Sequence, residues 1–152
     1  MALILDHLTV TRAMPIELIA AAAGAGFQGV GLFLHGMPQL GGMADFDLIH
    51  DVAARRECVR VARDVGCEIA IAYPFTISRG STAGDFDPAL DVAAELGARA
   101  VNVLVFDRHV ARRAEMLRHL CDEAESRGMM VGVEFFPVSA VAGFPDALAL
   151  RD

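Results

Sequence analysis

The stretch that decides the fold runs over residues 100–136 and reads AVNVLVFDRHVARRAEMLRHLCDEAESRGMMVGVEFF. It begins and ends with short apolar, β-rich runs, 100–106 and 130–136. Between these runs, apolar side chains recur at steps of three and four, which predicts an amphipathic helix over 109–126. We expect Asp107 to cap the start of this helix and Gly128 to end it. The predicted apolar face contains Val110, Ala114, Leu117, Cys121 and Ala124.

The same strand–helix unit recurs towards the N-terminus. Further apolar runs lie at 3–10, 30–34 and 69–75, and most are apolar on both faces, as in parallel strands that are covered on both sides. Three helices are predicted between these runs. Pro15 opens the first, whose apolar face is Leu18, Ile19 and Ala22. Asp45 or Asp47 opens the second, which extends to about Val65, and Asp87 caps the start of the third. Glycines follow the predicted helix ends at Gly26, Gly66, Gly97 and Gly128, and an incipient fifth helix follows the last strand. The pattern predicts a single α/β domain over 1–152 with a parallel sheet.

Two folds fit five successive βα units. One is an open doubly wound sheet of flavodoxin type, with strand order 2-1-3-4-5. The other is a partial TIM barrel, with about five of the eight strands in the order 1-2-3-4-5. In either fold the long glycine-rich loops 36–47 and 76–87 follow strands, at the edge where α/β proteins place their sites.

Composition narrows the possible partners. The 152 residues carry a net charge of -7, and every basic residue is an Arg, so the chain has no basic patch for a phosphate backbone and no nucleic-acid partner is expected. No apolar run is long enough for a membrane helix, and the start lacks the basic region of a signal peptide. Three widely spaced cysteines suggest free thiols, and we expect a cytoplasmic protein.

Two glycine-rich motifs have a structural interpretation. GAGFQG (24–29) matches the letters of the dinucleotide fingerprint, but it ends a predicted helix and leads into a strand, which is the reverse of the required context. GSTAG (80–84) could cradle a phosphate, but the chain contains no Lys for a phosphate-binding loop, and a flexible loop is favoured.

Glu134 is the strongest candidate for a functional residue. Strand alternation places it on one face with Met130 and Gly132, and a carboxylate buried in a parallel sheet is costly unless it is paired or bound to a cation. Its hard oxygen ligands suit Mg²⁺ or Mn²⁺, and the alternative is a structural salt bridge with an Arg such as Arg79 or Arg108. Candidate substrate contacts are His7, His35 and Tyr73, each in or at the end of a predicted strand.

Three stretches together resemble a known family. AAAGAGFQGVGL (21–32), AAELGARAVNVLV (93–105) and VGVEFFPVSAVAGFPDALAL (131–150) are similar to segments of the sugar phosphate isomerases and epimerases, the xylose isomerase-like TIM barrels. The resemblance implies a metal-dependent isomerase or epimerase that acts on a small-molecule sugar or polyol. It also implies that Glu134 is both a ligand of a divalent metal, Mg²⁺ or Mn²⁺, and a catalytic acid or base that moves a proton by way of an enediolate.

Two departures from the family pattern shape the expectations. Many members carry Glu near the end of the second strand, where this chain has Gly31. The family's other ligands come from strands six to eight, so one carboxylate alone cannot complete a Mg²⁺ site. We therefore expect a chain truncated at its C-terminus, inactive or nearly so alone, that associates with itself through exposed sheet edges. The alternatives are a flavodoxin-like small-molecule or signalling domain and a non-catalytic half-barrel interaction module.

Overall fold

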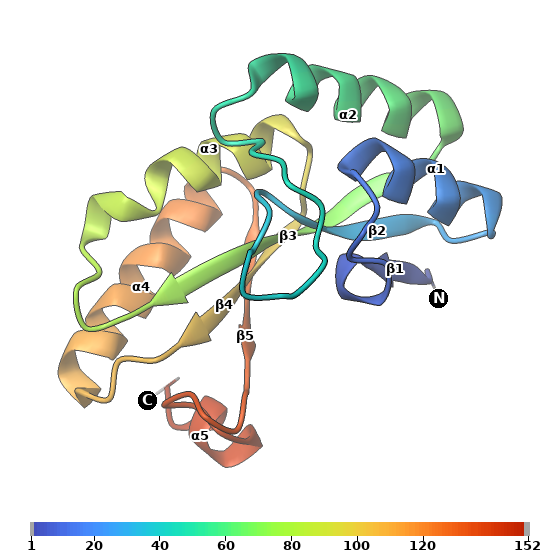
Figure 1. Cartoon of the computed structure of the whole chain (residues 1–152). Helices are drawn as coiled ribbons and strands as arrows, with labels where there is room; N and C mark the ends of the chain where they lie inside the picture. Colours follow the sequence, from blue (N-terminus) through green and yellow to red (C-terminus); the bar gives the residue numbers. More distant parts are fainter. Residues whose placement is uncertain (1, 151–152) are drawn as a thin grey trace.

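The sheet has five parallel strands in the order in which they occur along the chain (Figure 1). The computed structural model describes residues 2–150. The strands are β1 (Ile4–Asp6), β2 (Gly29–Phe33), β3 (Glu68–Ile77), β4 (Ala100–Val105) and β5 (Met130–Glu134). The order β1-β2-β3-β4-β5 confirms the partial TIM barrel, and it excludes the flavodoxin order, in which β1 would lie between β2 and β3.

Four helices pack against one face of this sheet, and a short fifth helix lies beyond the carboxyl end of β5 (Figure 1). The helices are α1 (Pro15–Gly24), α2 (Val52–Val65), α3 (Asp87–Glu95), α4 (Val110–Ser126) and α5 (Phe144–Leu148), with short 3₁₀ turns η1 (His7–Thr9) and η2 (Ala83–Asp85). The core joins apolar side chains of the helices to every second strand residue, for example Leu18, Ile19, Val30, Leu32, Leu90, Val101, Val103 and Leu120. None of the described helices is long and apolar enough to cross a membrane.

The other face of the sheet is open. Along β4, Val101 and Val103 are fully buried on the helix side, whereas Asn102 and Leu104 on the opposite face are half-buried. On β5 the same opposite face is exposed, and Met130 is 71% accessible. The expectation of strands covered on both sides is therefore wrong for β4 and β5, whereas all five residues of β2 are buried. Glu134 lies on the open face and is exposed, not buried as expected.

Two element boundaries, the end of β1 and the start of α2, differ from the prediction because aspartates cap turns at these places. Asp6 accepts a hydrogen bond from the Leu8 amide at 2.8 Å, which ends β1 and places His7 in η1 instead of inside the strand. Asp47 accepts from the His50 amide at 3.2 Å and closes a turn of its own. Helix α2 begins later, at Val52, where Asp51 is the N-cap.

Helix α4 confirms the periodicity but not every detail. Its N-cap is His109, and Asp107 instead accepts a hydrogen bond from the His109 amide at 2.9 Å. Val110 and Cys121 of the predicted apolar face are exposed. The residues that α4 buries are Met116, Leu117, Leu120 and Ala124.

The αβ turns follow the prediction closely. Gly26, Gly66, Gly97 and Gly128 all have positive φ angles, between 67° and 84°. At Gly26 the following Phe27 amide bonds to the Ala22 carbonyl at 2.9 Å, so the chain turns directly from α1 towards β2. The GAGFQG stretch is thus a helix end, as its context indicated.

Candidate functional site

Glu134 and Asn102 form the polar centre of the open face. Glu134 is the last residue of β5, and its register partner on β4 is Leu104, whereas Asn102 stands opposite Gly132. The side chain of Asn102 reaches diagonally along the sheet, and its Nδ2 donates to Glu134 Oε2 at 2.6 Å. No ion pair joins Glu134 to Arg79, Arg108 or any other cation among residues 2–150, so the salt bridge considered as the alternative is not formed.

Tyr73, on β3, joins this strand to β2 and to the turn η1 that follows β1. Its hydroxyl donates to the Gly31 carbonyl on β2 at 3.0 Å and accepts from the His7 amide, also at 3.0 Å. The side chain is only 6% exposed, and burial is the main cause that raises its pKa well above the ordinary value. The negative charges of Asp6 and Glu134 raise the pKa further, so the hydroxyl stays protonated and acts as a hydrogen-bond donor.

The space that Tyr73 occupies explains Gly31. A Cβ on Gly31 would lie 3.0 Å from Tyr73 Cε1 and 3.1 Å from its hydroxyl. The same position is 3.4 Å from a carboxylate oxygen of Asp6. At Gly31 the second strand therefore brings no side chain to the site, and the space is bordered by Asp6 and Tyr73. Two residues later, Phe33 of β2 packs edge-on to Tyr73, with ring centroids 4.4 Å apart.

His7 is fully buried beside this cluster. Its Nε2 bonds to the Ala13 carbonyl at 3.0 Å, and its Nδ1 lies 3.4 Å from the Phe33 amide. The ring stacks on Phe46, with centroids 5.6 Å apart, and desolvation is the main cause that lowers its pKa. The neutral ring thus ties the loop after β1 to the end of β2. Contact between His7 and a substrate stays a prediction.

His35 lies past the end of β2 and anchors the long loop that follows it. It pairs with Asp47 in an isolated antiparallel bridge, and its Nδ1 is 3.0 Å from the Gly36 carbonyl. Glu134 and Tyr73 thus share the open face and His7 adjoins Tyr73, whereas no hydrogen bond or ring contact within residues 2–150 joins His35 to these three. A role for His35 in substrate binding also stays a prediction.

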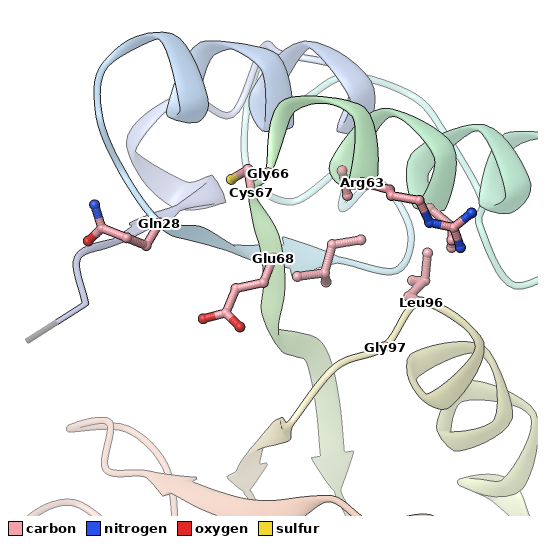
Figure 2. Close-up of a pocket in the computed structure, with 10 residues that line it drawn as sticks. Gln28, Arg63, Gly66, Cys67, Glu68, Leu96 and Gly97 are labelled. Carbon is pink, nitrogen blue, oxygen red and sulfur yellow. The ribbon is translucent and has the colours of Figure 1, made fainter.

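A hollow lies at the other end of the sheet. A depression of about 410 Å³ opens between the end of α2, the start of β3 and the end of α3 (Figure 2). Two of its polar side chains are engaged in structural contacts: Glu68 pairs with Arg99, and Gln28 donates to the Gly26 carbonyl at 2.7 Å. Burial raises the pKa of the Cys67 thiol in its wall, which disfavours the reactive thiolate. Glu68, Gln28 and Cys67 therefore give no sign of a reactive group in this hollow.

The donor set of the open face does not form a complete metal site. Among residues 2–150, no group of three or more His, Cys, Asp or Glu side chains lies close enough together to hold a metal ion. Asp6 already accepts a backbone hydrogen bond, and Glu134 has one oxygen engaged by Asn102. The described residues thus offer a divalent ion at most isolated carboxylate ligands.

Sequence reasoning did not assign Asp6 and Asn102 to the site. Asn102 had a usable signal, because it is the only polar residue in the apolar run AVNVLV and strand alternation gives it the face opposite the core. Asp6 had a weaker signal. The apolar run 3–10 continues past it, so the sequence did not indicate that Asp6 is the last residue of β1.

Comparison with solved structures supports the barrel assignment. A xylose isomerase-like TIM barrel/4-hydroxyphenylpyruvate dioxygenase fusion protein superposes with a TM-score of 0.74 at 22% identity, over 99% of this chain and 24% of that one. A xylose isomerase domain containing protein from Salmonella typhimurium superposes with a TM-score of 0.78 at 17% identity, over 98% of this chain and 55% of that one. D-allulose 3-epimerase from Methylomonas sp. superposes with a TM-score of 0.71 at 16% identity, over 100% of this chain and 58% of that one.

These likenesses define the fold, which is that of the xylose isomerase-like TIM barrels over nearly the whole chain. The chain spans between a quarter and three fifths of the length of these solved structures. No protein-family model and no curated protein matches the sequence.

Proposed function

We propose that this chain carries part of the sugar-binding site of an isomerase or epimerase, with Glu134 as the acid/base residue. The observation that carries the proposal is the position of the Glu134 carboxylate. It lies at the carboxyl end of a barrel strand, on the open face, and is held by a neutral amide. Residues at this end of a barrel strand are those that serve catalysis in TIM-barrel enzymes.

The proposed chemistry is a proton transfer next to a carbonyl group. The Glu134 carboxylate takes a proton from the carbon beside the sugar carbonyl, and the electron pair of that bond moves towards the carbonyl oxygen to give an enediolate. Return of the proton to the former carbonyl carbon completes an isomerisation, provided that the hydroxyl oxygen of the adjacent carbon loses a proton to become the new carbonyl and the former carbonyl oxygen gains one. Its return to the original carbon from the opposite side completes an epimerisation and calls for a second acid/base group.

Glu134 is also proposed as one carboxylate ligand of a divalent ion, Mg²⁺ or Mn²⁺. When bound, such an ion would polarise the sugar oxygens. The described residues do not complete its coordination, and the proton transfer proposed above is assigned to Glu134 itself. The remaining donors would come from further βα units of a complete barrel.

The test is hydrogen–deuterium exchange at the carbon next to the carbonyl of D-fructose and D-allulose. The sugars are incubated in D₂O with concentrated protein, with and without added Mn²⁺, and exchange is followed by NMR. We expect slow exchange above the protein-free rate, and a return to the protein-free rate in the Glu134→Gln variant, because that change removes the group that accepts the proton.

The matched control is Glu125→Gln, which removes an exposed carboxylate from α4. Equal exchange by wild type and Glu134→Gln would contradict the proposed role of Glu134. If the wild type causes no exchange above background and saturation-transfer NMR shows no contact with either sugar, the proposed function is wrong.

A further inference from the structure

The partner of Glu134 is unusual within this chain. Asn102 is the only asparagine among the 152 residues, and it interrupts the apolar strand β4 on the open face. It stands opposite Gly132, two residues before the pair formed by Leu104 and Glu134, which is the next pair on the same face. Because Gly132 has no side chain, the carboxamide can lie along the sheet and reach the carboxylate of that next pair.

Other carboxylates that bridge elements of this protein are neutralised by arginines. Arg55 of α2 pairs with Glu95 at the end of α3 at 2.7 Å, and Arg127 pairs with Asp91 at 2.8 Å. Glu134 instead receives one hydrogen bond from a neutral amide. A neutral donor fixes the direction of a carboxylate but leaves its negative charge uncompensated. In a structural ion pair, by contrast, the cation compensates that charge.

The two oxygens of Glu134 are also unequal. Oε2 accepts the bond from Asn102, whereas Oε1 accepts no hydrogen bond from any residue in the range 2–150. The orientation of the carboxamide follows from chemistry, because an oxygen turned towards the carboxylate would repel it and only the NH₂ group can donate. The Asn102 Oδ1 then lies on the side of Gly132, 3.7 Å from the place that a Cβ there would take.

We propose that Asn102 is the positioning residue of the site. It anchors Glu134 through Oε2 and leaves a charged, unshared Oε1 directed into the open face for a ligand. This inference rests on the proposed function, because it assigns Glu134 a working carboxylate. Its structural core, an anchored but unneutralised Glu134, can be measured without any turnover.

The first test uses the simplicity of the side-chain amide spectrum. Only Asn102, Gln28 and Gln39 carry carboxamides, so the ¹⁵N-labelled protein gives three pairs of NH₂ signals, and Asn102→Leu identifies the pair of Asn102 by its loss. We expect Glu134→Gln to shift the Asn102 pair and leave both glutamine pairs unchanged. Glu125→Gln is the control and should move none. An unmoved Asn102 pair in Glu134→Gln would overturn the inference.

The second test measures the freedom of the carboxylate by carbodiimide labelling, quantified by mass spectrometry. In Asn102→Leu, Glu134 should be labelled about 5-fold faster than in wild type, because the hydrogen bond no longer competes with attack on the reagent and such a bond contributes about 1 kcal/mol. Labelling of Glu125 in the same sample is the internal control. Asn102→Gln, which retains a donor, should restore part of the protection, and unchanged labelling in Asn102→Leu contradicts the inference.

Failure of the inference and failure of the proposed function can be told apart. If Glu134→Gln shifts the Asn102 pair, and Asn102→Leu both speeds the labelling of Glu134 and slows sugar exchange with unchanged sugar binding, both stand. If the amide shift and the labelling behave as expected but wild type neither binds nor exchanges sugar, the proposed function fails and the anchoring of Glu134 stands. If Glu134→Gln abolishes exchange but Asn102→Leu changes neither exchange nor labelling, Asn102 has no positioning role.

Discussion

At Gly31 the absence of a side chain has a direct structural cause. Tyr73 lies across the glycine, and its hydroxyl links the Gly31 carbonyl to the His7 amide. An added methyl group would meet the ring at 3.0 Å, closer than ordinary van der Waals contact. The space above Gly31 is therefore filled by Tyr73 from the neighbouring strand β3.

We predict that Gly31→Ala lowers the free energy of unfolding by about 1–3 kcal/mol, because overpacking displaces Tyr73 and weakens its two hydrogen bonds. Urea unfolding followed by circular dichroism measures the change. The control is Gly24→Ala at the end of α1, where no atom lies within 4 Å of the new methyl group and the change should be neutral or stabilising.

Combining Gly31→Ala with Tyr73→Phe separates the cause. Because the phenylalanine lacks the oxygen that would lie 3.1 Å from the new methyl group, the two changes should cost less together than the sum of the single changes. Strict additivity would show that Tyr73 and Gly31 do not share this space.

At the scale of the elements, the start of α4 depends on one buried carboxylate. The Asp107 side chain is 2% exposed, and it accepts hydrogen bonds from the Arg112 side chain, at 2.7 Å from Nη2, and from the His109 amide. The bond from Arg112 is the main cause that holds the pKa of Asp107 below its ordinary value. The carboxylate therefore joins the carboxyl end of β4 to the first turn of α4.

We predict that Asp107→Asn lowers the melting temperature at pH 7 by several degrees, because Arg112 loses its partner. Since the pKa of Asp107 is lower in the folded state, its contribution is fully present above the unfolded pKa near 4 and is lost as pH falls through the folded value. The difference in melting temperature between wild type and variant, measured by calorimetry, should thus shrink below pH 4. A deficit that is equal at pH 3 and pH 7 would contradict this assignment, and Asp122→Asn on the exposed side of α4 is the control.

Much of this element pattern could be predicted from the sequence, because burial imposes periodicity on it. The alternation in β4 and the glycines after each helix were sufficient to place the strands and the αβ turns. The capping aspartates were harder to place. Asp47, Asp51 and Asp107 all precede helices, and only the three-dimensional contacts distinguish the N-cap from an aspartate that closes a turn or binds an arginine.

The site was less predictable than the fold. Glu134 was identified because a carboxylate in an apolar strand calls for an explanation, but its exposure and its amide partner depend on which face the helices cover. Sequence alternation defines two faces and does not say which one is open. The link from Tyr73 to Gly31 and His7 joins residues up to 66 positions apart, and no local pattern indicates it.

At the scale of the whole molecule, the open face and the two sheet edges favour self-association. β1 and β5 each have one neighbour in the sheet, and unpaired strand edges invite pairing with another chain. Exposed apolar side chains surround the carboxyl end of β5, among them Phe135, Val138 and Phe144. The same features are what the second candidate function, a non-catalytic half-barrel interaction module, would use.

We predict concentration-dependent dimers or larger species in sedimentation velocity experiments. Met130→Lys should weaken this association by about 10-fold or more, because it places a charge on an apolar part of the open face next to the edge of β5. Val110→Lys changes a similarly exposed residue on α4 and should have no effect. A wild type that stays monomeric at all concentrations would contradict the prediction.

The irregularity in β3 has a consequence for the chemistry of the open face. Ala72 and Phe75 both lie on the helix side, opposite Val101 and Val103, although three positions separate them instead of two. The extra residue shifts the alternation of side chains by one position. Thr76 therefore pairs with Leu104, which in turn pairs with Glu134, so the three residues form one row across the open face. If the same residues paired with β4 in regular alternation, without the extra residue, the Phe75 ring would stand beside Leu104 in place of the Thr76 hydroxyl, and the surroundings of Glu134 on the open face would be apolar instead of polar.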